Sequence, residues 1–166
     1  MRNRLIVAAF VVTLFLLPAI AAQISVEFDD SVDFKGYRTY ALREGTPARR
    51  MDVQIRIEGF VSRELEQRGL HVTDDSPELI VRTYALVDKL TLEQLADQST
   101  WDFYTGLTDM DAYSVKAGTL VVDIADANGE KVLWRGLVAA PVSGSVASVE
   151  RKLDKAVAKM FRRFPR

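Results

Sequence analysis

The sequence contains no cysteine among its 166 residues. The fold must therefore hold together without disulfides, which a chain of this length can do because it buries a sufficient core. A lipid anchor on an N-terminal cysteine is excluded as well. Thiolate zinc sites are excluded for the same reason.

Histidine is almost absent, and His71 is the only one. A single histidine without cysteine cannot supply the usual zinc ligands. Asp74 and Ser76 follow His71 closely, but nothing in this spacing holds a base against the hydroxyl group as a catalytic triad requires. Nucleophile-elbow, dinucleotide-binding and P-loop motifs are missing. The sequence therefore predicts no catalytic residue, no metal site and no cofactor, and indicates that the protein is not an enzyme.

Long hydrophobic runs are confined to the beginning of the chain. Arg2 and Arg4 precede an apolar run over residues 5–17, which Pro18 ends. This run is shorter than the roughly 20 residues needed to cross a bilayer. Small residues follow it, as signal peptidase requires. The sequence predicts a signal peptide over residues 1–21 and an exported, periplasmic protein.

The position of cleavage has two solutions, before Ala22 or before Gln23. The alternative is an uncleaved leader that anchors the protein in the membrane through residues 5–24. The formal net charge of the whole chain is −1, and loss of the two leader arginines makes it more negative. Nucleic acid is therefore not an expected partner. Basic residues near the C-terminus suit a helix end, and weak contact with a membrane surface stays open.

Hydrophobic periodicity predicts an α+β fold over residues 22–166. Two amphipathic helices are expected, one after an Asp52 cap and ending at Gly69, the other over residues 146–164. A loop is expected at residues 44–47, and Asn128-Gly129 predicts a tight primed hairpin turn. The expected strands cover residues 24–28, 37–42, 70–72, 79–87, 115–125 and 132–139. The simplest arrangement is a single domain, in which a largely antiparallel β-sheet carries both helices packed on one face.

Residues 88–114 form a long acidic and aromatic insert between two strands. Three aromatic side chains, Trp101, Phe103 and Tyr104, fall close together in it. They either cover the second face of the sheet or are presented to a partner, because aromatic residues are enriched in binding hot spots. The acids of this insert lack the order of a calcium-binding loop.

Trp134 and Arg135 are neighbours on a predicted strand and must point to opposite faces of the sheet. One is expected in the core and the other on the open face. Arg135 is therefore a candidate binding residue together with the aromatic cluster of the insert, with a structural role as the alternative.

Several short motifs occur in a specific order along the chain. They are DFKGYRTY at residues 33–40, RGL at 68–70, PELIV at 77–81, GTLVVD at 118–123, VLWRG at 132–136 and FP at 164–165. In this order the chain resembles the bacterial envelope lipoprotein-type family catalogued as domain of unknown function 4136. The resemblance implies an envelope location and an α+β fold, with no activity to carry over. The chain departs from the family in lacking a lipid-attachment cysteine and in its acidic insert.

Two functions remain as hypotheses. The first is a non-enzymatic binding or envelope-assembly module, which would present the open sheet face and the insert to an envelope protein. The alternative is a small carrier that holds an apolar ligand between the insert and the sheet, in a cavity lined by Leu90, Leu92, Leu95, Trp101 and Phe103. The sequence does not predict the oligomeric state.

The leader prediction leads to a direct test. Cell fractionation should recover the protein in the periplasm, and N-terminal sequencing should begin at Ala22 or Gln23. Recovery in the membrane with Met1 intact would contradict the prediction and indicate an uncleaved anchor.

Overall fold

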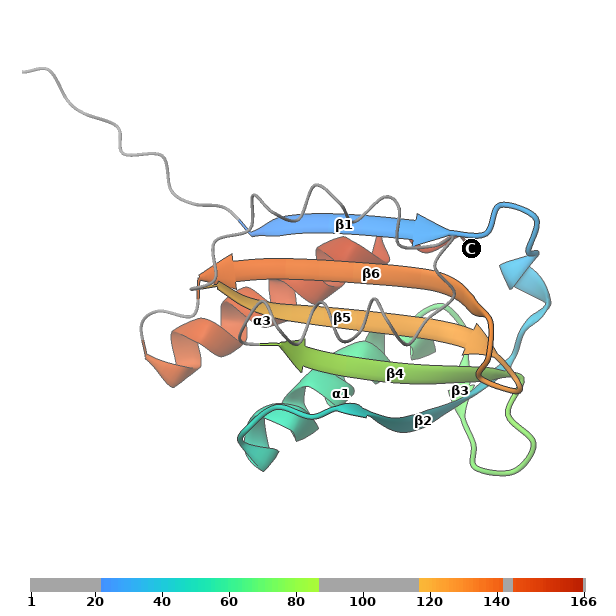
Figure 1. Cartoon of the computed structure of the whole chain (residues 1–166), viewed down its shortest axis with the longest axis horizontal. Coiled ribbons are helices and arrows are strands. Elements are labelled where there is room, and N and C mark those ends of the chain that lie inside the picture. Colours follow the sequence, from blue (N-terminus) through green and yellow to red (C-terminus); the bar gives the residue numbers. More distant parts are fainter. Residues whose placement is uncertain (1–21, 87–116, 142–144, 166) are drawn as a thin grey trace, which may run out of the picture.

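The computed structural model describes residues 22–86, 117–141 and 145–165 (Figure 1). The predicted signal peptide and the whole of the predicted insert lie outside these residues and remain predictions. The elements in chain order are β1 (Gln23–Phe28), the short 3-10 helix η1 (Phe34–Gly36), β2 (Thr39–Thr46), α1 (Met51–Glu66), β3 (His71–Val72), β4 (Leu79–Leu86), β5 (Ala117–Asp126), β6 (Val132–Pro141) and α3 (Val146–Phe161).

The described strands form one sheet in the order β1-β6-β5-β4-β2-β3. The neighbours from β1 to β4 are antiparallel, whereas β2 pairs in parallel with both β4 and β3. A parallel connection needs a crossover of a dozen or more residues, and α1 supplies it between β2 and the strands that follow. This crossover places α1 on one face of the sheet.

Both helices lie on the same face of the sheet (Figure 1). They share one hydrophobic core with that face, to which α1 contributes Ile57, Val61 and Leu65 and α3 contributes Val157 and Met160. The predicted α+β fold, with a mostly antiparallel sheet and two helices on one face, is confirmed. No helix among the described residues is long and apolar enough to cross a membrane.

The alternation of side chains along β5 divides the sheet into two faces. Leu120, Val122 and Ile124 belong to the core beneath the helices. Val121 belongs to a smaller cluster with Leu86, Leu137 and Ala139. Successive strand residues point to opposite faces, so these two clusters lie on the two sides of the sheet. Both sides of β5 are therefore buried, as expected for a central strand.

Trp134 lies at the centre of an aromatic group between β6 and the end of α3. Its ring centroid is 5.0 Å from that of Phe161 and 5.6 Å from that of Phe164, and it is fully buried. Gly136 follows on the same face of β6. A Cβ atom at Gly136 would lie 2.4 Å from both the Met160 sulfur and the Trp134 ring. The absence of a side chain there allows α3 to approach the sheet.

The beginning of α1 differs from the sequence prediction. Arg50, and not Asp52, occupies the N-cap position, and its side chain makes no capping hydrogen bond. Because the helix already begins at Met51, Asp52 lies in its first turn. The Asp52 carboxylate instead accepts two hydrogen bonds from the Arg50 guanidinium, at 3.0 and 2.6 Å.

Two predicted connections also differ. The expected loop at residues 44–47 is largely strand, because β2 continues to Thr46 beside β4. The hairpin between β5 and β6 is longer than a primed two-residue turn. Among its residues only Gly129 has a positive φ, of 73°, and the loop is closed by the Asp126 amide donating to the Lys131 carbonyl. The two-residue prediction was wrong because Asp126 accepts from the amides of Glu130 and Lys131 and stabilises the wider loop.

The ends of both helices follow the predicted pattern closely. Gly69 has a φ of 75°, and the buried Leu70 donates its amide hydrogen to the Leu65 carbonyl. This arrangement is typical of a left-handed helix termination. The last helix ends at Phe161 rather than at Phe164, although Phe164 remains buried against the aromatic group.

Replacing two glycines should change stability in opposite directions. Gly136→Ala should lower the free energy of unfolding by about 1–3 kcal/mol, because the new methyl group overpacks the contact between β6 and α3. Gly59→Ala is the matched control on the exposed side of α1, where nothing lies within 4 Å of the new Cβ. It should raise the free energy of unfolding by about 0.5–1 kcal/mol. Urea denaturation of the three proteins measures both effects, and a neutral Gly136→Ala would contradict the packing described.

Candidate functional site

A pocket of about 280 Å³ lies between the helices and the sheet. Its walls come from the beginning of α1 with the segment before it, the first part of α3, the end of β4, the beginning of β5 and the end of β6. These segments gather at the left-hand end of the sheet in Figure 1. The pocket therefore lies at the end of the fold where both helices begin.

The pocket reflects a gradient of side-chain size along the core. The aromatic group around Trp134 fills the space where the helices end. At the opposite end many lining residues are small, and small side chains leave space between two packed layers. The small lining residues are Ala48, Ala85, Gly118, Ala140 and Ala156, and the larger aliphatic ones are Val53, Ile57, Leu86, Leu120, Val138, Val149 and Leu153.

The charged residues of the pocket all have the same sign. Among the described residues that line it, Arg49, Arg50 and Lys152 are basic and none is acidic. All three side chains belong to exposed residues, so the cations stand at the solvent side of an apolar interior. An apolar cavity with charged groups at its edge is a common form of small-molecule site.

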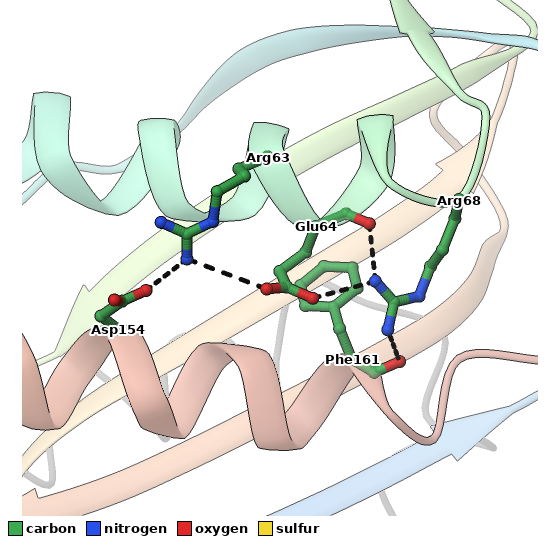
Figure 2. Close-up of polar contacts among 5 residues, drawn as sticks. All are labelled: Arg63, Glu64, Arg68, Asp154 and Phe161. Carbon is green, nitrogen blue, oxygen red and sulfur yellow. Dashed lines mark hydrogen bonds and ion pairs between the residues drawn. The ribbon is translucent and has the colours of Figure 1, made fainter.

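The two helices run side by side in the same direction. Arg56 pairs with Glu150 at 3.0 Å, and Arg63, about two turns further along α1, pairs with Asp154 further along α3. Figure 2 shows this contact together with the weaker one from Arg63 to Glu64, at 3.8 Å. Since the pairs advance along both helices together, the two helix dipoles are aligned and repel each other.

Arg68 compensates this repulsion where the helices end (Figure 2). Its Nη1 donates to the Glu64 main-chain oxygen at 2.7 Å and to the Glu64 carboxylate at 2.9 Å. Its Nη2 donates to the main-chain oxygen of Phe161 at 2.6 Å. One guanidinium therefore satisfies terminal carbonyls of both helices and places positive charge at their negative ends.

The opposite face of the sheet carries a row of charged side chains across neighbouring strands. In register from β1 to β4 these are Glu27, Arg135, Asp123 and Arg82. Arg135 and Asp123 are each 3% exposed, and the guanidinium donates from both Nε and Nη2 to the two carboxylate oxygens. Bidentate geometry of this kind is the strongest form of ion pair.

Burial shifts the pKa values of the acids in this row more strongly than the charges of their cationic neighbours do. Desolvation raises the pKa of the Asp123 carboxyl, while the hydrogen bonds from Arg135 act in the opposite direction. Desolvation also raises the pKa of the Glu27 carboxyl, again against the attraction of Arg135. The acids of this row are therefore harder to ionise than exposed carboxyls, and the ion pair between Asp123 and Arg135 joins β5 to β6.

Of the four predicted binding residues, Arg135 is the one that lies within the described part of the chain. Trp134 points into the core, and Arg135 lies on the opposite face, as the strand prediction required. Arg135 contacts Asp123, which the sequence did not single out. Trp101, Phe103 and Tyr104 lie outside the described residues, as do the residues expected to line a carrier cavity beside the insert.

His71 is exposed at the beginning of β3, the outermost described strand of its edge. Within the described parts of the chain, no group of three or more histidine and acidic side chains could hold a metal ion.

The pocket residues had no distinct signal in the sequence. Arg49 and Arg50 precede α1 as an ordinary basic pair, and the small lining residues belong to the usual apolar stripes. One signal was available in retrospect, since Ala156 is a small residue in an α3 stripe otherwise made of large ones. This small residue indicates a pocket only when the residues that it faces across the core are also known.

The sheet order and the single helix layer define an α+β domain with an apolar pocket between its layers. Residues 24–166 match the family described as Domain of unknown function (DUF4136), and the chain belongs to that family. The predicted family membership is confirmed. The description of that family as lipoprotein-type belongs to the resemblance alone, and the absence of a lipid anchor from this chain remains a prediction. No curated protein matches the chain.

Solved structures share the fold at low sequence identity. A PDZ domain protein from Parabacteroides distasonis superposes with a TM-score of 0.58 and 16% identity over 87% of this chain. The chain spans 36% of that protein's length. PelC from Paraburkholderia phytofirmans, solved as a dodecamer, superposes with a TM-score of 0.50 and 9% identity, covering 84% of this chain and 94% of PelC. At such identities the likeness extends to the fold alone.

Removing one member of the buried ion pair should be more harmful than removing both. Arg135→Met leaves the Asp123 carboxylate buried without its counter-charge, and we expect the free energy of unfolding to fall by about 3–5 kcal/mol. The double variant Asp123→Leu, Arg135→Met should recover most of that loss, because an apolar pair needs no compensation. Chemical denaturation of both variants checks this. A double variant as unstable as the single one would contradict the compensation described.

Proposed function

We propose that this protein is a non-enzymatic binding module of the cell envelope that holds an apolar ligand in the pocket between α1, α3 and the sheet. The observation that carries the proposal is the pocket itself, with about 280 Å³ of space beside mainly aliphatic side chains. Aliphatic walls bind a ligand by removing its apolar surface from water, and this binding requires no particular functional group on the ligand.

The size of the pocket supports a ligand rather than a packing defect. Small-molecule sites begin at roughly 300 Å³, whereas a cavity of roughly 150 Å³ already holds a benzene molecule. A space of about 280 Å³ is thus close to the lower end of functional pockets. Empty apolar volume of this size also reduces stability, because its lining loses contacts. A bound ligand would restore those contacts.

The pocket lies at a different place in the fold from the cavity that the carrier hypothesis expected. The cavity expected from the sequence lay between the insert and the open face of the sheet. The pocket lies instead on the helix face and is lined by described residues. The rival hypothesis, in which the insert presents Trp101, Phe103 and Tyr104 to an envelope protein, depends on residues outside the described ones and stays a prediction.

Two features support an envelope location for this binding. The first 21 residues have the length, basic start and apolar run of a signal peptide. The chain also belongs to the family that it was expected to resemble, and that resemblance implied an envelope location. Apolar molecules in an aqueous compartment between membranes need a protein to cover their surface, which is the role of such a pocket.

An environment-sensitive fluorescent probe tests this function. N-phenylnaphthylamine, an apolar dye, should bind the purified protein and gain fluorescence on entering the pocket. Ala156→Phe places an aromatic ring in the pocket and should abolish most of the gain. Ala147→Phe makes the same change at an exposed position of the same helix and should leave binding unchanged.

Circular dichroism must first establish that both variants are folded. Equal dye binding by the two folded variants would mean that the dye does not occupy the pocket, and the proposed function would then fail. Loss of binding in Ala156→Phe alone supports it.

A further inference from the structure

The two edges of the described sheet are protected to different degrees. At one edge β3 is only two residues long, and β2 beside it has a register shift between Arg43 and Thr46. Exposed Arg43 and Glu44 add charge there. Short strands, bulges and charged side chains keep a sheet edge from pairing with another chain. At the other edge, β1 is six residues long and pairs with β6 without a register shift, so this edge is suited to pairing.

The backbone of β1 presents hydrogen-bonding groups on its outer side. β1 ends the order of the described strands. The amide of Asp29, the residue after β1, donates to the Leu133 carbonyl of β6 at 2.9 Å. Because these groups alternate in direction along a strand, the even-numbered residues of β1 direct theirs away from β6. The Ile24 carbonyl does so, since it accepts from Nη1 of Arg163 at 3.5 Å.

The same residues leave apolar surface uncovered on the helix face of the sheet. Ile24 and Val26 are only partly buried against the core beneath the helices, and Phe28 is 38% exposed. Residues that lie opposite each other in a ladder project to the same face, so alternate side chains of an added strand would cover these three. A further strand would therefore gain burial as well as backbone hydrogen bonds.

A row of basic side chains on α3 ends beside this edge. Arg151, Lys155, Lys159 and Arg163 recur at every fourth residue, a spacing that places them along one side of a helix. All four residues are exposed, and none forms an ion pair with a side chain of the described residues. Arg163 follows the end of α3, and its contact with Ile24 brings the row to β1.

The acids of α3 lie on a different side of the helix. Glu150 and Asp154 are its only acidic residues, and they pair with Arg56 and Arg63 of α1. The basic row is therefore not neutralised by its own helix. Pairing of β1 with β1 of a second copy would bring two such rows together, and like charges disfavour that arrangement. The occupant that fits this edge is a chain of opposite charge.

We infer that the outer edge of β1 binds an extended acidic segment of a partner protein, which adds a strand to the sheet. Its backbone pairs with the outward groups of β1, and its acidic side chains on the helix face lie beside Lys159 and Arg163. Backbone pairing supplies affinity, and the charges select the partner. None of the residues of this surface lines the apolar pocket, so the inference goes beyond the proposed function and does not depend on it.

Two capped peptides as long as β1 test the charge requirement. In one, glutamate alternates with valine, and in the other, lysine replaces each glutamate. Fluorescence anisotropy of the labelled peptides, titrated with the purified protein, measures their affinities. The acidic peptide should bind on the order of tenfold more tightly than the basic one, and added salt should reduce this preference.

Val26→Pro tests the backbone pairing. The Val26 amide points away from β6, so proline removes a donor from the outer edge and leaves the ladder with β6 intact. Affinity for the acidic peptide should fall on the order of tenfold. Val72→Pro is the matched control, because the Val72 amide points outward from the exposed β3 edge. It should leave binding unchanged.

A charge-matched pair of double variants tests the basic row. Lys155→Gln with Lys159→Gln should weaken binding of the acidic peptide about fivefold. Arg38→Gln with Arg43→Gln removes the same charge at exposed positions beside β2, on the other side of the sheet, and should leave binding unchanged. Circular dichroism establishes that each variant is folded.

Amide hydrogen exchange of the original protein gives a measurement that needs no variant. The bound acidic peptide should slow exchange at the outward amides of Ile24, Val26 and Phe28. Unchanged exchange at these amides, failure of the acidic peptide to bind, or equal binding of the two peptides would overturn the inference. Full binding by a folded Val26→Pro variant would overturn it as well.

Sedimentation of the protein alone tests the rival occupant of this edge. A dimer that Val26→Pro dissociates would mean that β1 pairs with a second copy, and the inference of an acidic partner would then be wrong. A monomer whose binding of the acidic peptide is reduced by Val26→Pro and by the Lys155, Lys159 variant, but by neither control, supports the inference.

Discussion

The structure depends on two helices that lie side by side and point the same way. Arg68 offsets the repulsion between their aligned dipoles. Its guanidinium contacts terminal carbonyls of both helices and the Glu64 carboxylate (Figure 2). It also lies over the Phe161 ring, 5.5 Å from the ring centroid. The helix ends are thereby fixed over the aromatic group around Trp134. With that end fixed, the space left by small side chains collects at the other end, where the pocket lies.

Much of the fold could be predicted from local periodicity. The strands and both helices were found because their apolar residues recur at spacings that belong to one type of element. The α1 cap and the β5–β6 turn were wrong for a local reason. In each case an acid, Asp52 or Asp126, makes a hydrogen bond that competes with the expected one. Short-range preferences decide which elements form more reliably than where they begin and end.

The candidate site could not be predicted in the same way, because it depends on long-range register. Asp123 became the partner of Arg135 only through the pairing of β5 with β6, which sets the two residues opposite each other. Ala85 and Ala156 are ordinary members of their own elements. They form a pocket because α3 crosses the sheet where small residues from three strands also lie. The sequence pattern within one helix or strand does not predict which residues of other elements it will contact.

The position of β1 at the edge of the sheet has a consequence for the order of folding. Its described neighbour is β6, and the adjoining ion pair joins Asp29 to Lys131, 102 positions away along the chain. Closing so long a loop costs little more entropy than closing a moderate one, but it cannot happen until β6 exists. In a chain that emerges from its N-terminus, the first strand to be made is therefore the last to find its neighbour. The pairing of β1 with β6 joins residues far apart in the sequence, and contacts of this kind slow folding, so late closure of this edge should dominate the folding kinetics.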